Sequence, residues 1–277
     1  MPDFLSSLRK NIGNVFAFPI RLALANGWIR RRAIFELTQH FYGELGVRVP
    51  LANGLVCPVT SLEHWVSYEN IFCEKEYDAL LAKMPLPVRW IDLGCHAGHF
   101  TLRLAMLQRT PWSALLVDAD SRSAPAVRAM IEANRFDAAS VKFLHAAIGE
   151  SGDDVAFAEN VYMTSEATRG AARAVRRLLP EEMLAKFLPP YDLVKLDIEG
   201  AEFAFFKSYE PVLRRTRRVL FEWHSWQPGG GGKAQLIAMA EQLGFRFVGE
   251  QHAERTLRRD GKPVTAGLVL MENERLG

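Results

Sequence analysis

Short apolar runs alternate along most of this chain with segments whose apolar residues recur at helical spacing. The first such unit is an apolar run at residues 88–93 that stops at Gly94 and is followed by helical spacing over residues 100–107. The second is a run at 114–118 followed by helical spacing over 124–134. Strands that alternate with helices in this way predict a parallel sheet covered by helices on both faces.

The same pattern continues toward the C-terminus. Three further strands are predicted at residues 141–144, 191–196 and 218–223, with helices at 201–208 and 233–243. Two more apolar runs, 245–248 and 266–270, follow without a helix between them and predict an antiparallel pair at one edge of the sheet. The expected fold is α/β, with a seven-stranded, mostly parallel sheet whose plan resembles the Rossmann-like sheet of class I methyltransferases.

Residues 1–80 lack this alternation, and we expect them to form a helical and irregular N-terminal appendage to a main domain at 81–277. Within the main domain, residues 165–190 include an arginine-rich stretch with helical spacing over 168–187, placed to form a lid insertion over a cleft. Basic residues between Arg9 and Arg32 allow two interpretations of the N-terminal helical segment. It lies on an anionic membrane or a partner, or it packs on the core with its basic face in water, and we favour the second.

Charge and cysteine content narrow the class of protein. The formal net charge is +2, from 34 basic and 32 acidic residues, so the composition gives no reason to expect a nucleic-acid partner. The three cysteines fit neither a disulfide framework nor a metal-ligand spacing, which predicts free thiols in a reducing compartment. Arg21 interrupts the apolar N-terminal residues, so a spanning helix and a cleaved secretion signal are both disfavoured and a cytoplasmic location is expected.

Two glycines and two acids fall at the ends of the first two predicted strands. Asp92, Gly94 and Gly98 follow the first strand, and Asp118 ends the second. Glycines let the backbone turn sharply and approach a ligand closely, and a carboxylate in the position of Asp118 can accept hydrogen bonds from both hydroxyls of a ribose. Each residue alone has an ordinary explanation as a turn or a helix cap. Together, at this spacing, they predict a site for a nucleoside-containing cofactor at the carboxyl ends of the strands.

The acid before the glycine loop distinguishes between two such cofactors. Binding of a dinucleotide calls for G-x-G-x-x-G, whereas the pair here is Gly94 and Gly98, with Asp92 preceding it. A carboxylate repels a pyrophosphate and attracts a sulfonium or an α-amino group. The loop therefore favours S-adenosylmethionine, with S-adenosylhomocysteine as the product, over NAD.

Four stretches of the sequence resemble the FkbM family of S-adenosylmethionine-dependent methyltransferases: WIDLGCHAGHFTLRLA, LLVDADSRSAPAVRAMIEAN, HAAIGE and VKLDIEGAEFAFF. The resemblance covers approximately residues 88–225, and the last block is the most specific. It implies that Asp92, Gly94 and Gly98 hold the methionine part, Asp118 the ribose, and the segment His145-Ala146-Ala147 the adenine edge.

One departure from the family is visible after the second strand. Where the family commonly has an acid followed by proline, Ala119 follows Asp118, so Asp120 competes as the ribose ligand. Ala119 is counted among the candidate cofactor contacts. His96, inside the glycine loop, is counted with it, although no chemistry is assigned to its ring.

The candidate catalytic residues lie at the ends of the fourth and fifth strands. Removing a proton from an acceptor hydroxyl needs a base near the methyl group, and His224 is the best single candidate because its ordinary pKa lies near neutrality. Asp197, also a candidate cofactor contact, and Glu222 could orient His224 or contact the substrate. Oxygen and imidazole groups suit Mg²⁺ or Mn²⁺, but the spacing matches no metal motif, so no metal is predicted. Glu199 and Glu202 follow Asp197, where acids are favoured near a helix start.

The function predicted from the sequence is S-adenosylmethionine-dependent O-methylation of a hydroxyl on a sugar, a glycan or a small-molecule metabolite, the acceptor classes that the resemblance implies. Two alternatives remain open. One is an NAD(P)-dependent oxidoreductase on a similar sheet, which would bind NAD tightly and ignore S-adenosylmethionine. The other is a catalytically silent cofactor-fold module held by its basic N-terminus at a membrane or in a biosynthetic complex, which would bind ligand without turnover.

Overall fold

The structure is a computed structural model that describes Tyr42 and residues 46–150, 155–158, 166–167, 173–225, 232–259 and 262–276. Residues 1–41 lie outside the described residues. The basic stretch on which the membrane-contact prediction depends, and the expected N-terminal helix, fall there.

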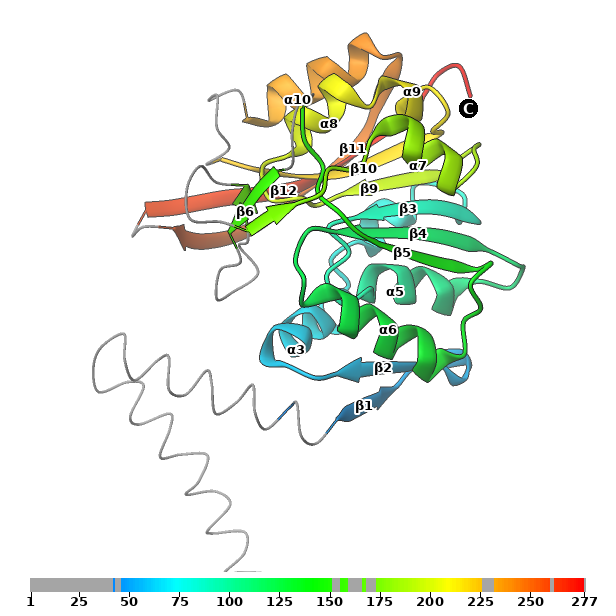
Figure 1. Ribbon diagram of the computed structural model, residues 1–277. Coiled ribbons are helices and arrows are strands. Elements are labelled where there is room, and N and C mark those ends of the chain that lie inside the picture. The colour runs from blue at the N-terminus through cyan, green and yellow to red at the C-terminus, as the bar shows by residue number, and fades with distance from the viewer. Residues whose placement is uncertain are drawn as a thin grey trace, which may run out of the picture.

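Seven strands form the central sheet in the order β11-β12-β10-β9-β3-β4-β5 (Figure 1). β12 lies between β10 and β11 and is antiparallel to both, while the remaining pairs are parallel. The predicted mostly parallel sheet with an antiparallel pair at one edge is therefore confirmed. The strands are β3 (Arg89–Leu93), β4 (Ser113–Asp118), β5 (Val141–His145), β9 (Leu193–Leu196), β10 (Arg218–His224), β11 (Phe245–Arg259) and β12 (Lys262–Asn273).

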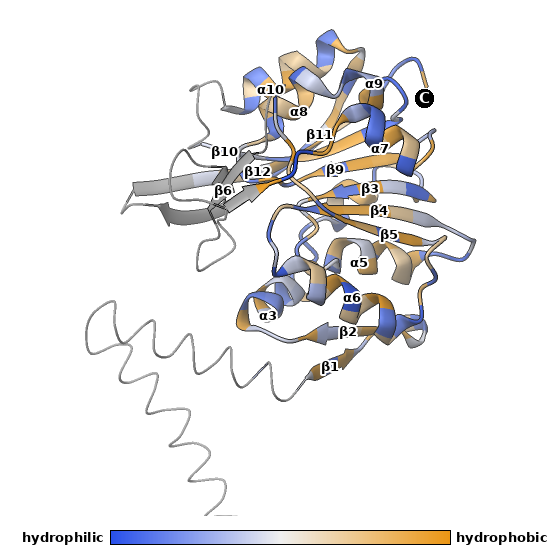
Figure 2. Ribbon diagram, viewed as in Figure 1, coloured by the Kyte–Doolittle hydropathy of each residue, from blue (hydrophilic) through white to orange (hydrophobic). Residues whose placement is uncertain are grey.

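Helices cover both faces of this sheet, as the alternation in the sequence predicts (Figure 1). The hydropathy colouring shows apolar strands in the middle and polar residues toward the outer sides of the helices (Figure 2). Burial of apolar side chains between the layers supplies the main driving force for this arrangement. One face carries α5 (His99–Leu107) and α6 (Ser123–Asn134), and the other carries α7 (Pro180–Lys186), α8 (Glu202–Ser208), α9 (Glu210–Leu213) and α10 (Gly232–Gln242).

The central strands carry an uncommon set of polar residues on a single face. Successive strand residues point to opposite faces, and Val194 and Leu196 pack in the core beneath α8, so Lys195 between them faces α5. The parallel register pairs Lys195 with Asp92 of β3. The ladder between β9 and β10 ends at Leu196 and Phe221, one residue before Asp197 and Glu222 respectively. Strand pairing thus gathers these polar residues where the strands end.

The N-terminal segment, here residues 46–81, packs against the α5 and α6 side of the sheet. It contains a two-stranded hairpin that the sequence prediction of helical and irregular structure missed. The side chain of Asn134 in α6 pairs with the backbone of Val56, accepting from its N–H at 2.7 Å and donating to its carbonyl at 2.8 Å. This contact imitates strand pairing and leaves no periodic signal in the sequence. The elements are β1 (Val47–Pro50), η1 (Ala52–Gly54), β2 (Val56–Val59), α3 (Leu62–Tyr68), η2 (Glu69–Cys73) and α4 (Asp78–Leu81).

The segment between β5 and β9 differs in part from its prediction. β6 (Val155–Ala158), β7 (Glu166–Ala167) and β8 (Arg173–Val175) form a small antiparallel sheet in the order β7-β6-β8. The helical spacing predicted over 168–187 is wrong at β8, because pairing with β6 decides that backbone. A helix begins only at Pro180, a residue favoured in a first turn because its φ is already helical.

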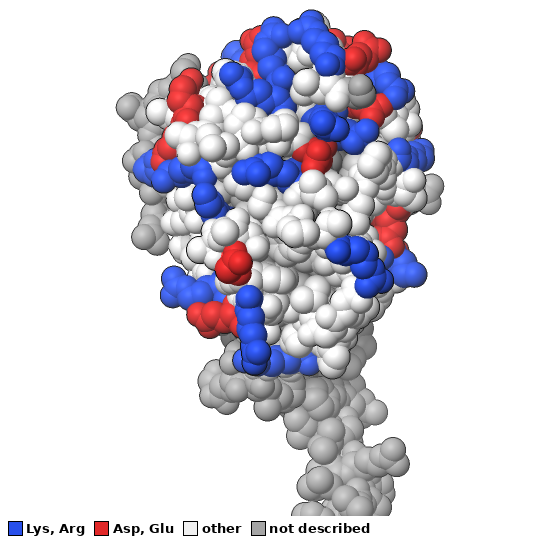
Figure 3. All heavy atoms as spheres, turned by 90° about the vertical axis from the view of Figure 1, so that its right-hand side faces the viewer, with Lys and Arg blue, Asp and Glu red and all other residues white. Residues whose placement is uncertain are grey.

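The described surface carries mixed charge. On the face turned toward the viewer in Figure 3, Lys and Arg gather toward the top with acidic side chains beside them. Ion pairs such as Lys207–Glu150 and Arg214–Glu210 are examples of such neighbours on the described surface. The three cysteines are free thiols, as predicted. Within the described ranges, no helix combines the length and hydrophobicity needed to cross a bilayer.

We expect Gly94→Ala to destabilise the fold severely. Gly94 has φ +70°, and a Cβ there would lie 1.6 Å from the carbonyl oxygen of Asp197. The free energy of unfolding should fall by about 3 kcal/mol or more, because backbone strain and a clash with backbone add. Urea denaturation measures this. Gly46→Ala is the matched control, since Gly46 has φ +53° with nothing within 4 Å, and it should lose only about 1 kcal/mol. Equal losses in the two variants would contradict the prediction.

Candidate functional site

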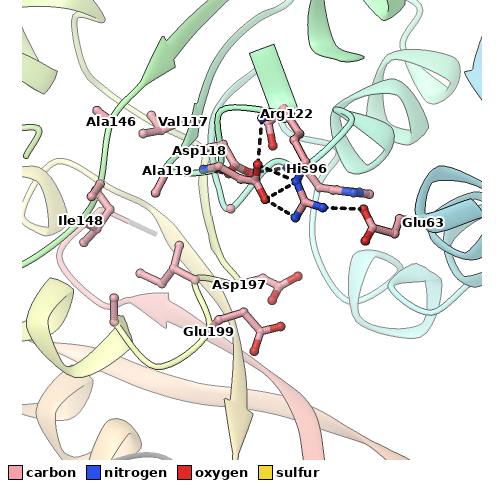
Figure 4. A pocket seen from close by; sticks show the side chains of 16 residues that line it. Glu63, His96, Val117, Asp118, Ala119, Arg122, Ala146, Ile148, Asp197 and Glu199 are labelled. Carbon is pink, nitrogen blue, oxygen red and sulfur yellow. Dashed lines mark hydrogen bonds and ion pairs between the residues drawn. The ribbon is translucent and has the colours of Figure 1, made fainter. Parts of the chain in front are cut away.

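A cleft opens beyond the carboxyl ends of β3, β4, β5 and β9, the edge where open α/β sheets bind ligands (Figure 4). It encloses about 870 Å³ of space outside the protein atoms, part of it open to solvent. Its walls come from α3, the loop after β3, the β4–α6 connection, the segment after β5 and the turn after β9. Its polar lining residues are Glu63, His96, Asp118, Asp120, Arg122, Ser123, Asp197 and Glu199.

The loop after β3 is held in shape by its glycines and by Asp118. His96 has φ +50°, an uncommon conformation for a residue with a side chain, and its backbone N–H donates to Oδ2 of Asp118 at 2.6 Å. Gly98, with φ +77°, leaves room for the Met130 side chain, whose Cε would lie 2.6 Å from an added Cβ. Gly94 and His96 line the cleft, whereas Gly98 supports the loop from behind.

Asp118 ends β4 and lines the cleft. Its Oδ1 accepts the N–H of Asp120 at 2.8 Å, while Oδ2 accepts that of His96. Burial raises the pKa of Asp118 to about 6, against the lowering effect of these hydrogen bonds. Each carboxylate oxygen has a second lone pair, so Asp118 keeps acceptor capacity for a ligand.

Asp120, the competing ribose ligand, is bound by Arg122. Nη2 of Arg122 lies 2.6 Å from Oδ2 of Asp120, and Nε lies 3.0 Å from Oδ1. The backbone N–H of Arg122 also donates to Oδ1 at 2.8 Å. Both oxygens of Asp120 are thus engaged by a guanidinium, which leaves Asp118 as the better placed acceptor.

Asp92 does not line the cleft. Its carboxylate is fully buried, accepting the Thr101 hydroxyl at 2.9 Å and lying 3.4 Å from the ammonium of Lys195. Burial raises the pKa of Asp92, and Lys195 and Thr101 oppose this rise. The structure therefore places Asp92 behind the glycine loop, one layer away from the cleft surface.

Lys195 is a residue that the sequence reasoning missed, although it stands inside the most specific motif. Its buried Nζ lies 3.3 Å from Oδ2 of Asp197 and donates to the carbonyl of Gly94 at 2.9 Å. Burial alone would lower the pKa of Lys195, but Asp197 and Asp92 outweigh this effect and raise it. Lys195 therefore stays charged and joins the glycine loop to the turn after β9. The sequence did carry a signal, because Lys195 lies within the predicted strand 191–196 and lysine is rarely buried in a strand without a partner.

The three predicted catalytic residues come together. Glu222 hydrogen-bonds Asp197, and its Oε1 lies 3.6 Å from Nε2 of His224. Burial, followed by repulsion from Asp197, raises the pKa of Glu222 well above its ordinary value, so Glu222 is the more readily protonated of the two acids. Burial opposes ionisation of Asp197 too, but Lys195 and His224 hold its pKa below the ordinary value. Among these three residues only Asp197 lines the cleft, and the described residues contain no cluster of three or more His, Cys, Asp or Glu suited to a metal ion.

Glu199 links His224 to the cleft. It lines the cleft, and its Oε2 lies 4.0 Å from Nε2 of His224. Its φ of +50° places it in the turn before α8 rather than in the first turn of a helix. Glu202 does begin α8 and is buried, where it accepts the N–H groups of Ile198 and Gly200 and so fixes this turn.

The segment after β5 contributes apolar wall. Ala146 and Ala119 line the cleft as predicted contacts should, together with Ala147 and Ile148. His145 is exposed and does not line the cleft, and its Nε2 lies 3.0 Å from the carbonyl oxygen of Ala119. Glu63 and Arg122 were also missed by the sequence reasoning, and no local pattern could have joined two residues from such distant segments.

The strand order and the cleft at the carboxyl edge define the class I methyltransferase fold, as predicted from the sequence. Residues 120–247 match the model of the methyltransferase FkbM domain, which confirms the predicted resemblance over these residues.

Solved structures similar to this chain have low sequence identity. One is magnesium protoporphyrin IX methyltransferase from Synechocystis PCC 6803 with bound SAH, at 11% identity, covering 76% of this chain and 85% of that one, with a TM-score of 0.46. Another is an O-methyltransferase from Bacillus cereus in complex with SAH, at 12% identity, 73% and 81% coverage and a TM-score of 0.45. No curated protein matches the sequence.

Lys195→Met should destabilise the protein at neutral pH by about 3–5 kcal/mol, because it leaves the buried Asp92 carboxylate without its cation. The folded-state pKa of Asp92 lies above its unfolded value, so the penalty from its charge appears as pH rises through the folded value and is relieved as pH falls. Urea denaturation at pH 5 and pH 8 should therefore give a smaller loss at pH 5.

Two comparisons control this prediction. Lys142→Met removes an exposed lysine of β5 and should cost little at either pH. Adding Asp92→Asn to Lys195→Met should recover part of the loss, since the uncompensated charge is removed. A loss that is the same at both pH values would contradict a role for the Lys195–Asp92 ion pair.

Proposed function

We propose that this protein transfers a methyl group from S-adenosylmethionine to a hydroxyl of a sugar, a glycan or a small-molecule metabolite. The observation that carries the proposal is the acidic lining of the cleft, with Asp118 at the end of β4. Among the described residues that line it, five are acids, namely Glu63, Asp118, Asp120, Asp197 and Glu199, against the single guanidinium of Arg122.

This set of acidic side chains fits a ligand that is a positively charged nucleoside. Carboxylates attract a sulfonium and an α-ammonium and repel a pyrophosphate. Because Arg122 is already bound to Asp120 on both oxygens, it is poorly available to compensate two phosphates. The charge balance therefore favours S-adenosylmethionine over NAD, the cofactor of the competing oxidoreductase hypothesis.

The lining residues suggest how the cofactor is held. Asp118 would accept one ribose hydroxyl through a remaining lone pair, and Ala119 and Ala146 would contact the adenine. The glycine loop at Gly94 and His96, with Asp197 beside it, would hold the methionine part. Asp92 would act through Lys195 rather than by direct contact. When bound, S-adenosylmethionine supplies an electrophilic methyl group on its sulfonium.

The residues behind Asp197 would remove the proton from the hydroxyl of the methyl acceptor. His224 is the proposed base, and its Nε2 is 3.6 Å from Glu222 and 4.0 Å from Glu199. Since His224 is buried and Glu199 lines the cleft, the proton would reach His224 by way of the Glu199 carboxylate. Glu222, whose pKa is raised by burial and by Asp197, would contact Asp197 and help to hold this arrangement. A proton-accepting cluster is what a hydroxyl acceptor requires.

Titration calorimetry with S-adenosylhomocysteine tests the cofactor. The wild type should bind, and Asp118→Ala should weaken binding by about 10- to 100-fold, since charged hydrogen bonds to the ribose are lost. Because the pKa of Asp118 is about 6, wild-type affinity should fall as pH drops from 8 to 5, and Asp118→Asn should lack that dependence. NAD is the control ligand. Binding of NAD without binding of S-adenosylhomocysteine would refute the proposal.

Transfer of labelled methyl groups to a panel of sugars and phenols tests the base. With an acceptor that supports turnover, His224→Gln and Glu199→Gln should each lower kcat by about 10²-fold or more, and His224→Gln should leave the affinity for S-adenosylhomocysteine within about twofold. Glu241→Gln, on the exposed side of α10, is the matched control and should behave as wild type. Cofactor binding without transfer to any acceptor would favour the silent-module alternative, and full activity of His224→Gln would exclude His224 as the base.

A further inference from the structure

Glu63 enters the cleft from outside the region that carries the family resemblance. It is the second residue of α3 (Leu62–Tyr68), which precedes the segment matched by the FkbM model. Only 6% of its surface is exposed, yet it lines the cleft. Figure 4 shows its carboxylate directed toward Arg122 and the middle of the site.

The two oxygens of Glu63 have different surroundings. Oε2 lies 3.5 Å from Nη1 of Arg122, whose guanidinium is shared with Asp120. Oε1 is buried and has no hydrogen-bond partner among the described residues. Leaving a carboxylate oxygen buried without a donor is costly, and such an atom in the wall of a ligand cleft has a ready explanation if the ligand supplies the donor.

The neighbours of Glu63 identify which donor this is. Through Arg122, Glu63 is joined to Asp120 and so to the end of β4, where Asp118 accepts the N–H of Asp120. The turn that carries Asp197 lies instead against Gly94 of the glycine loop. S-adenosylmethionine carries hydroxyl donors on its ribose and an ammonium on its methionine part. Glu63 is therefore at the ribose end of the cleft.

We propose that Glu63 is a second acidic ribose contact, which accepts a hydrogen bond from a ribose hydroxyl at Oε1 while Arg122 holds Oε2. This inference rests on the proposed function, because it requires the cofactor to be a nucleoside. It makes the N-terminal segment part of the cofactor site rather than an appendage. Cofactor binding would then also hold α3 against the cleft.

The test combines a change in the protein with a change in the ligand. Glu63→Met removes both oxygens and keeps a long helix-forming side chain, and Glu132→Met makes the same change on the exposed side of α6 as a control. Each protein is titrated with S-adenosylhomocysteine and with its 2′-deoxy and 3′-deoxy analogues. Glu63→Gln is a second variant that keeps the shape of the side chain, and urea denaturation confirms that each variant is folded.

We expect Glu63→Met to weaken S-adenosylhomocysteine binding about tenfold and Glu63→Gln to weaken it less, with Glu132→Met unchanged. Removing the hydroxyl that Glu63 contacts should weaken wild-type binding by a similar factor but weaken Glu63→Met no further. A merely structural role would lower affinity for all three ligands equally.

The results of these titrations distinguish the role of Glu63 from the proposed function. Wild-type binding that Glu63→Met leaves unchanged, or weakens equally for every ligand, would overturn the role of Glu63 and leave the proposed function standing. A wild type that binds none of the three ligands would overturn the proposed function, and with it the role of Glu63.

Discussion

The buried ammonium of Lys195 is the interaction on which the site depends. It lies between the carboxylates of Asp92 and Asp197, at 3.4 and 3.3 Å, and it donates to the backbone carbonyl of Gly94. A buried carboxylate is tolerated only with a close partner, so the fully buried Asp92 depends on this cation. The same contact ties β3 to β9 at the edge where the cleft opens. It thus sets both the charge and the shape of the site.

The rest of the polar cluster follows from strand register. Because Asp197 and Glu222 lie one residue beyond the last paired residues of adjacent parallel strands, their carboxyl groups meet, and burial together with this contact raises the pKa of Glu222. Asp197 remains charged beside Lys195, while His224 lies behind Glu199. The cleft therefore presents negative charge to a ligand, and its proton-accepting groups stand one layer deeper. This division suits a cationic cofactor and a hydroxyl acceptor.

The N-terminal segment completes the cleft from the side. Its hairpin docks on α6 through the paired hydrogen bonds between Asn134 and Val56, and α3 carries Glu63 to Arg122. The segment that matches the FkbM model, residues 120–247, contains neither Glu63 nor the glycine loop. One wall of the cofactor cleft is thus built from a part of the chain with little sequence signature of its own.

The sequence by itself determined the order of strands and helices along the chain, because apolar runs and helical spacing are local properties of side chains that face a core. It also located Asp118 and Gly94 at strand ends. Only the tertiary structure decided that Asp92 is buried behind the loop, that β8 is a strand and that Glu63 reaches the cleft. These features depend on pairing and packing between distant segments. Such contacts leave no periodic trace in either segment alone, so their arrangement appears only when the chain is folded.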